Sequence, residues 1–157
     1  EALLHVANIM KARGRLTEAL AQYDLALKAE PRHAGAATNR GAVLQEQGKP
    51  LEARAAYHQA LEIDTDNIDA RYNLGTLLQE TGHPEDALKE YRVVMAQAPG
   101  HAGAQVNIAY ALRELGQLEE ALAASRDALR LAALGVPALG VNFWPRSKRY
   151  LDPAAAA

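Results

Sequence analysis

A repeat with a period of 34 residues organises most of this chain. Glycines recur at that interval: Gly14, Gly48, Gly82 and Gly116. Alanines that follow an acidic residue recur at the same interval, as do tyrosines four positions later: Ala19, Ala53, Ala87 and Ala121, with Tyr23, Tyr57 and Tyr91. Because chance similarity between helices drifts out of register, agreement of several columns at one period indicates a stack of similar structural units.

Each unit reads as two amphipathic helices around a tight turn, most clearly between Ile68 and Gly100. Aromatic residues make up only 5% of the chain and alanine and leucine are frequent, so helix is favoured over strand. The repeated glycine follows the first helix, where a left-handed residue commonly ends a helix. Pro50 and Pro84 then fit the first turn of the second helix. The sequence therefore predicts an all-α fold.

The repeat resembles the tetratricopeptide (TPR) repeat, a helix-turn-helix of about 34 residues, over approximately residues 1–131. The family pattern W-x2-L-G-x2-Y, A-x3-F and P reads as follows in the third unit: Arg71, Leu74, Gly75, Leu78, Ala87, Tyr91 and Pro99. Two positions depart from this pattern, where Arg71 and Leu78 replace aromatic residues. The aliphatic stem of an arginine, or a leucine, can still cover the apolar surface that an aromatic residue covers. The second unit departs at Arg40, which stands where the family has leucine.

This resemblance implies a right-handed α-solenoid of stacked antiparallel hairpins, with units at approximately 1–33, 34–67, 68–101 and 102–134. The small residues Gly41, Gly75 and Ala109 are expected to let the two helices of a hairpin approach closely. The alanines of the 34-residue pattern are expected to do the same. Because no hairpin buries its apolar face alone, about three repeats are needed for stability, and four are recognisable here.

In TPR proteins the first helix of each repeat lines a concave surface, and in this chain that helix carries a stripe of mostly polar residues. We call it the polar stripe, and it comprises Asn39, Ala42, Glu46, Asn73, Thr76, Glu80, Asn107, Tyr110 and Glu114. Asparagine is a mediocre residue inside a helix, so three at one position need a reason. A carboxamide both donates and accepts hydrogen bonds, so this ladder could bind the backbone of an extended peptide. The alternative is that asparagine serves a structural role in TPR helices.

Acidic residues along the stripe predict the charge of the ligand. TPR proteins that clamp the C-terminal carboxylate of heat-shock chaperones place lysine and arginine beside the asparagines. The matching positions here are Gly35, Asp69, Gly103, Glu46, Glu80 and Glu114. Such a lining disfavours a carboxylate terminus and favours a neutral or basic segment, with Tyr72 and Tyr110 as candidate anchors. The alternative is a solvated charged face.

Composition excludes several other classes of function. A net charge of -2 and a pI near 6.2 provide no basic field for nucleic acid, and no apolar run approaches the roughly 18 residues of a membrane span. The histidines do not converge on a metal or catalytic set: His5, His33, His58, His83 and His101. Asp64, Asp66 and Asn67 lack the glutamate that closes a calcium loop. We expect no enzyme activity, no cofactor and no metal.

The end of the chain departs from the repeat. Residues 135–157 contain the only phenylalanine and tryptophan, Phe143 and Trp144, followed by basic residues, and are expected to form a cap, a linker or a peptide-like tail. Self-association through residues 141–157 is one possibility. Because Glu1 already lies in a helical pattern, we expect a longer protein. The absence of cysteine fits the cytosol or the periplasm, and we expect the cytosol.

The leading hypothesis is a non-enzymatic scaffold that binds an extended peptide or protein segment in its concave groove. Two alternatives stay open. TPR arrays also precede catalytic domains, so the chain could be the targeting segment of a larger enzyme such as a glycosyltransferase. It could also be a homo-oligomeric assembly module.

Overall fold

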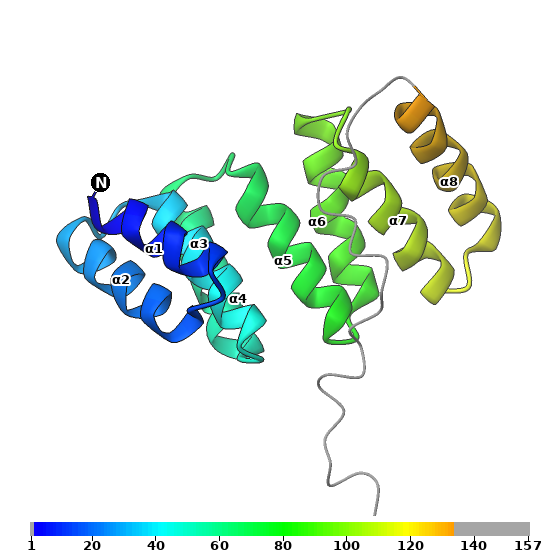
Figure 1. Cartoon of the computed structure of the whole chain (residues 1–157). Coiled ribbons are helices and arrows are strands. Elements are labelled where there is room, and N and C mark those ends of the chain that lie inside the picture. Colours follow the sequence, from blue (N-terminus) through cyan, green and yellow to red (C-terminus); the bar gives the residue numbers. More distant parts are fainter. Residues whose placement is uncertain (1, 134–157) are drawn as a thin grey trace, which may run out of the picture. The chain divides into compact units, whose positions relative to one another are not determined.

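The computed structural model describes residues 2–133, and these residues form eight helices and no strand (Figure 1). The helices are α1 (Ala2–Ala12), α2 (Leu16–Ala29), α3 (Ala34–Glu46), α4 (Pro50–Ile63), α5 (Ile68–Glu80), α6 (Pro84–Gln97), α7 (Ala102–Glu114) and α8 (Leu118–Ala133). The predicted all-α class is confirmed for this part of the chain. The predictions for residues 135–157, including self-association through 141–157, lie outside the described residues.

The described part of the chain divides into two compact units, and the boundary between them, after Asn73, falls within the sequence of α5. In the first unit α1 packs on α2, and α3 packs on α2, α4 and α1. In the second unit α7 packs on both α6 and α8. The first helices α3 and α7 therefore each contact the second helix of their own repeat and the second helix of the repeat before it, as stacking of hairpins requires.

The turns between the helices of a hairpin are closed by a left-handed glycine. Gly48 has φ +75°, its N–H donates to the carbonyl of Gln45 at 3.0 Å, and the N–H of Lys49 donates to the carbonyl of Leu44 at 2.9 Å. This pair of bonds is a Schellman motif, which satisfies carbonyls that the end of a helix leaves without partners. Gly14, Gly82 and Gly116 also have positive φ, and Pro50 and Pro84 begin the second helices, so both predictions are confirmed.

A buried tyrosine fills the space beside the glycine of the first helix. A Cβ atom on Gly41 would lie 2.6 Å from Cε1 of Tyr57, and one on Gly75 would lie 2.7 Å from Cε1 of Tyr91. Both rings are fully buried. The predicted close approach is therefore confirmed at these two glycines. The repeated alanines are buried as well: Ala19, Ala53, Ala87 and Ala121.

The second helix of one repeat packs against the first helix of the next through a recurring contact, which we call the stacking contact. In the first unit Val43 of α3 belongs to the buried cluster that contains Tyr23 of α2, with Leu20 packed against it. Near the other end of these helices Leu27 packs against a cluster that contains Ala37. The guanidinium of Arg40 adds an ion pair with Asp24 at 2.6 Å, which explains an arginine where the family has leucine.

Three first helices begin with a side chain that accepts a hydrogen bond from their own backbone. Nδ1 of His33 accepts from the N–H of Ala36 at 3.1 Å, and Nδ1 of His101 accepts from Ala104 at 3.0 Å. Asn67, at the same position of the intervening repeat, accepts from the N–H of Ala70 at 2.9 Å. These residues are therefore N-caps. Sequence reasoning missed this role, although the period places all three in one column.

Replacing His33 by alanine should lower the free energy of unfolding by about 1 kcal/mol, because the start of α3 loses its cap. His33→Asn should retain most of that stability, since asparagine caps α5 at the same position. Urea unfolding followed by circular dichroism measures both. His83→Ala is the matched control, because His83 precedes α6 without a side-chain cap. Equal losses for His33→Ala and His83→Ala would show that the cap contributes nothing.

Candidate functional site

The residues of the polar stripe lie on an accessible face of their helices. On α3, Asn39 is partly exposed and Glu46 is exposed, whereas Ala36, Val43 and Leu44 on its other faces are buried. The same accessibility, partial or full, holds for every other predicted contact residue: Asp69, Tyr72, Asn73, Thr76, Glu80, Asn107, Tyr110 and Glu114. In each unit the amides and carboxylates of the stripe are therefore accessible to a partner.

In the first unit the stripe is joined to a hydrogen-bond network across three helices. Oη of Tyr23 on α2 donates to Oδ1 of Asn8 on α1 at 2.5 Å, and Nδ2 of Asn39 on α3 donates to the same oxygen at 3.1 Å. Burial raises the pKa of Tyr23, and the carboxylate of Glu46 raises it further. Asn39 therefore ties the second repeat to the first while remaining at the surface.

The second unit contains a related network around Tyr91 of α6. Nδ2 of Asn107 on α7 donates to Oη of Tyr91 at 3.2 Å, and this hydroxyl donates to Oε1 of Gln79 on α5 at 3.1 Å. Oγ1 of Thr76 lies 3.5 Å from the same hydroxyl. Nε2 of Gln79 in turn donates to the carboxylate of Glu114 at 3.2 Å. Three predicted site residues, Thr76, Asn107 and Glu114, are thus brought together by one tyrosine and one glutamine.

In the second unit the hydroxyl of the buried Tyr91 bonds directly to a stripe residue, Asn107, whereas in the first unit Asn8 joins the hydroxyl of Tyr23 to Asn39. Asn39 and Asn107 each bond to the network of the preceding repeat, which supports the structural alternative for these two asparagines. Sequence reasoning missed Asn8, Tyr23 and Gln79 as partners of the stripe. The sequence contained a signal for the glutamine, since Gln45 and Gln79 are 34 residues apart. The structure gives these two glutamines the same role, because Tyr57 donates to Gln45 at 2.8 Å as Tyr91 donates to Gln79.

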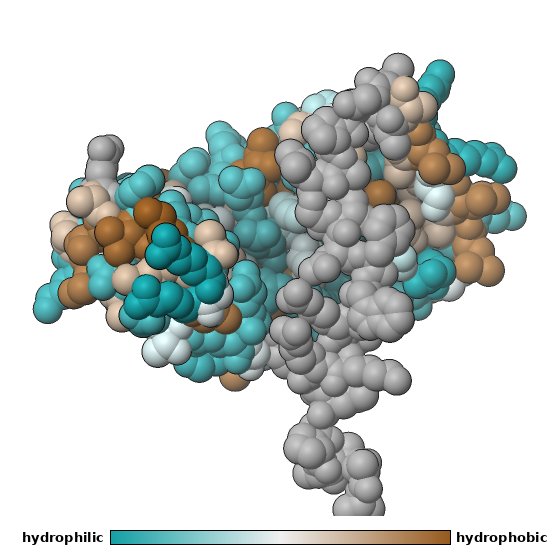
Figure 2. Space-filling view, viewed as in Figure 1, coloured by the Kyte–Doolittle hydropathy of each residue, from teal (hydrophilic) through white to brown (hydrophobic). Residues whose placement is uncertain are grey.

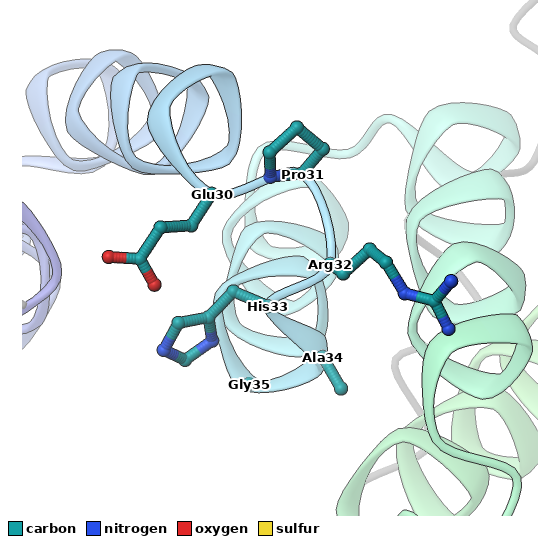
Figure 3. Close-up of a pocket in the computed structure, with 6 residues that line it drawn as sticks. All are labelled: Glu30, Pro31, Arg32, His33, Ala34 and Gly35. Carbon is teal, nitrogen blue, oxygen red and sulfur yellow. The ribbon is translucent and has the colours of Figure 1, made fainter.

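Two hollows of about 530 Å³ each lie in the first unit near the start of α3. One is lined by Leu4, His5 and Asn8 of α1, together with Ala2 and His33, and so adjoins the network of Tyr23. The other is lined by residues 30–35, and Figure 3 shows the side chains of Glu30 and His33 pointing to the same side while Arg32 points away. Glu30 places a carboxylate where an anionic ligand would be repelled.

The charge of the stripe is mainly negative. Asp69, Glu46 and Glu114 are exposed, and Gly35 and Gly103 provide no cation at the positions where chaperone-binding TPR proteins have one. One cation does reach a stripe residue, because the guanidinium of Arg113 lies 4.6 Å from the ring centroid of Tyr110.

Within residues 2–133 there is no group of three or more metal-ligating side chains. No helix in that range is long and apolar enough to cross a membrane.

Comparison with known protein families shows to which family the chain belongs. Two sequence profiles described as tetratricopeptide repeat match residues 32–100 and 72–136, and together they cover more than half of the chain. The chain belongs to the tetratricopeptide repeat family. No curated protein matches it. Tetratricopeptide arrays are generally non-catalytic. Membership of the family supports a role of this chain as a scaffold for protein-protein interaction.

Solved structures show the same tetratricopeptide fold. MamA from Desulfovibrio magneticus RS-1 (residues 41 to the end) has a TM-score of 0.77 and 23% identity, covering 83% of this chain and 73% of that one. MamA from strain MSR-1 has a TM-score of 0.74 and 21% identity, covering 85% and 76%. At this identity the likeness concerns the fold, and it confirms the predicted α-solenoid of helical hairpins.

Proposed function

We propose that this chain binds an extended segment of a protein partner along the polar stripe, with Asn39, Asn73 and Asn107 contacting the backbone of the ligand. The observation that carries the proposal is the accessibility of carboxamides at three equivalent positions of successive first helices. An extended peptide presents N–H and C=O groups at regular intervals, and a carboxamide can pair with both. Binding through the backbone requires no particular ligand side chain.

The networks beneath the stripe support this proposal because they orient its side chains before a ligand arrives. A carboxamide has two N–H groups and a carbonyl, and the bond from Asn39 to Asn8 uses one N–H. Because that bond fixes the plane of the amide, less side-chain freedom is lost on binding. The structural role and the binding role of Asn39 are therefore compatible.

Specificity comes from groups beside the asparagines. Tyr110, with Arg113 stacked on its ring, offers a rigid aromatic surface, and aromatic residues are enriched at interfaces. In the first unit, the hollow beside His5 and Asn8 has room for a ligand side chain. The carboxylates of Asp69, Glu46, Glu80 and Glu114 favour neutral or basic segments. The ligand class is therefore an extended, neutral to basic peptide.

Selection from a peptide library should yield extended sequences that contain lysine or arginine and no cluster of acidic residues. For one selected peptide, combining Glu46→Gln, Glu80→Gln and Glu114→Gln should weaken binding about 3- to 10-fold at low salt, since exposed ion pairs contribute little each. The dependence of affinity on salt should also become weaker. Fluorescence anisotropy measures both quantities.

The matched control combines Glu52→Gln, Glu62→Gln and Glu85→Gln, which remove the same charge from exposed positions of second helices. Its affinity should stay close to that of the wild type. Equal losses for the two triple variants would show that only the net charge of the protein matters. Selection of acidic peptides would contradict the predicted ligand charge.

A further inference from the structure

One of the two hollows of the first unit lies along the polar stripe. By the 34-residue period, His5 stands at the position of Asn39, and Asn8 stands at the position of Ala42. Both α1 residues are exposed, and both line the hollow of about 530 Å³ that we call the first-repeat hollow. Its other lining residues are Ala2, Leu4 and His33. The hollow therefore lies between α1 and the start of α3, which are successive first helices.

Asn8 offers hydrogen-bond donors to a ligand in this hollow. Its Oδ1 accepts from Oη of Tyr23 at 2.5 Å and from Nδ2 of Asn39 at 3.1 Å. A carboxamide oxygen has two lone pairs, so these two bonds use its capacity as an acceptor. What Asn8 still offers is its NH₂ group, which can only donate.

His33 offers a second donor, because its role as an N-cap fixes its tautomer. Nδ1 accepts from the N–H of Ala36 at 3.1 Å, and a ring nitrogen that accepts carries no proton. In a neutral imidazole the proton is then on Nε2, which becomes a donor. Figure 3 shows the ring of His33 projecting out from the start of α3, on the same side as the carboxylate of Glu30.

The surroundings of these donors are partly apolar and partly acidic. The half-buried Leu4 lines the first-repeat hollow, and Figure 2 shows hydrophobic groups beside hydrophilic ones over α1. His33 also lines the second hollow, where Glu30 places a carboxylate. A ligand in the first-repeat hollow therefore meets donors, an apolar side chain and a neighbouring negative charge.

We propose that the first-repeat hollow is a subsite for a side-chain carboxamide, that of glutamine or asparagine, in the peptide bound along the polar stripe. The carbonyl oxygen of the ligand accepts from the NH₂ group of Asn8 and from Nε2 of His33. Its NH₂ group faces the carboxylate of Glu30, and its methylene groups pack on Leu4. This subsite rests on the proposed function, because the carboxamide reaches the hollow as part of the bound peptide.

Other ligand side chains match the hollow less well. Lysine and arginine bring only donors, so the N–H groups of Asn8 and His33 are left without acceptors. Glutamate brings acceptors but adds a second negative charge beside Glu30, which repels it. Leucine fills the space and makes no hydrogen bond. The hollow therefore adds one neutral polar position to a ligand that is otherwise neutral to basic.

Peptides selected from a library on the full chain provide the probe. Selection should enrich glutamine or asparagine at one position, and three derivatives of one selected peptide then carry leucine, glutamate or lysine there. Each derivative should bind the wild type about 10-fold more weakly, because the bonds from Asn8 and His33 are lost or are opposed by Glu30. Fluorescence anisotropy at pH 8, where histidine is ordinarily neutral, measures the affinities.

Two variants of the full chain remove the donors and keep the contacts that hold the fold. Asn8→Asp keeps an acceptor for Tyr23 and Asn39 but replaces the NH₂ group by a carboxylate oxygen. Its preference should reverse, so that the lysine derivative binds more tightly than the glutamine peptide. His33→Asn keeps a cap, as Asn67 does for α5, but has no Nε2 donor. It should weaken the glutamine peptide about 3- to 10-fold and leave the leucine derivative unchanged.

Asn67→Asp is the matched control for Asn8→Asp. It adds the same charge to the first unit, and aspartate is as good an N-cap as asparagine. This control should keep the wild-type order of affinities for the four peptides. Circular dichroism shows that every variant is folded.

Three results would overturn the subsite while leaving binding along the polar stripe intact. The first is a selected peptide that tolerates leucine at every glutamine or asparagine position. The second is tighter binding of the glutamate or lysine derivative by the wild type, and the third is an unchanged order of affinities in Asn8→Asp. Failure to select any peptide would instead overturn the proposed function, and this subsite with it.

Discussion

Replacing Gly75 by alanine should lower the free energy of unfolding by about 1–3 kcal/mol, the usual cost of overpacking a core. The expected destabilisation is opposite in sign to the effect of helix propensity, which favours alanine over glycine by about 1 kcal/mol inside a helix. The added Cβ would lie 2.7 Å from Cε1 and 2.9 Å from Cδ1 of Tyr91. The ring is fully buried and its hydroxyl is bonded to Gln79 and Asn107, so it has little room to move.

A double-mutant cycle tests whether the tyrosine is the cause. In a Tyr91→Ser background, Gly75→Ala should be neutral or stabilising, because the ring is gone and only helix propensity remains. The fourth repeat already pairs Ala109 with Ser125 at these positions. Urea unfolding measures each variant. The control is Gly100→Ala, since Gly100 has open space around it and no positive φ. An equal cost of Gly75→Ala in both backgrounds would contradict this explanation.

The first repeat shows how alanine and tyrosine can coexist. Ala7 occupies the repeat position of Gly41 and Gly75, in the same repeat as Tyr23. Lys11 occupies the position of the two glutamines that accept hydrogen bonds from Tyr57 and Tyr91. There the hydroxyl bonds to Asn8 on the same helix as Ala7 instead. The destabilisation predicted for Gly75→Ala therefore depends on the partner that holds the tyrosine, and is not a general rule for this column.

Replacing Asn39, Asn73 and Asn107 together by alanine should weaken binding of a selected peptide about 100-fold. At about 1 kcal/mol per hydrogen bond, three lost contacts amount to about 3 kcal/mol, and each 1.4 kcal/mol is about tenfold in affinity. The same variant loses the bonds to Asn8 and Tyr91, about 2 kcal/mol of stability. Alanine's better helix propensity at three positions offsets a similar amount. The stability of the array should therefore change little.

Fluorescence anisotropy and urea unfolding separate the two effects. The control replaces Gln22 and Gln59, carboxamides on the second helices α2 and α4, by alanine. It should retain wild-type affinity. Unchanged affinity in the asparagine variant would reject the ladder as a binding site. A variant that is largely unfolded would show instead that the asparagines are mainly structural.

The repeat predicted the helices well because its signals are local. A glycine in the left-handed region ends a helix wherever it stands, and Pro50 begins one, so the period alone located Gly14, Gly48, Gly82 and Gly116 at turns. The close approach at Gly41 and Gly75 was predicted from their small size. Its specific cause, the ring of a tyrosine on the partner helix, depends on a contact between helices that the period does not name.

The candidate site was only partly predictable for the same reason. Its exposed residues follow from the face of a helix, and the structure places all of them at the surface. Their partners lie on other helices, so the bonds of Asn39 to Asn8 and of Asn107 to Tyr91 required the packing of whole hairpins. The N-cap role of His33 and His101 was not predicted, because histidine is an uncommon N-cap.

The most direct test of peptide binding through the asparagine ladder observes the side-chain amides themselves. A ¹⁵N-labelled chain titrated with a selected peptide reports each asparagine side chain separately, after assignment by single substitutions. The side-chain NH₂ signals of Asn39, Asn73 and Asn107 should shift together and saturate with the dissociation constant measured by anisotropy. Asn67, whose side chain caps α5, serves as the internal reference and should not shift. Saturating binding that leaves the three ladder signals unmoved would contradict the proposed function.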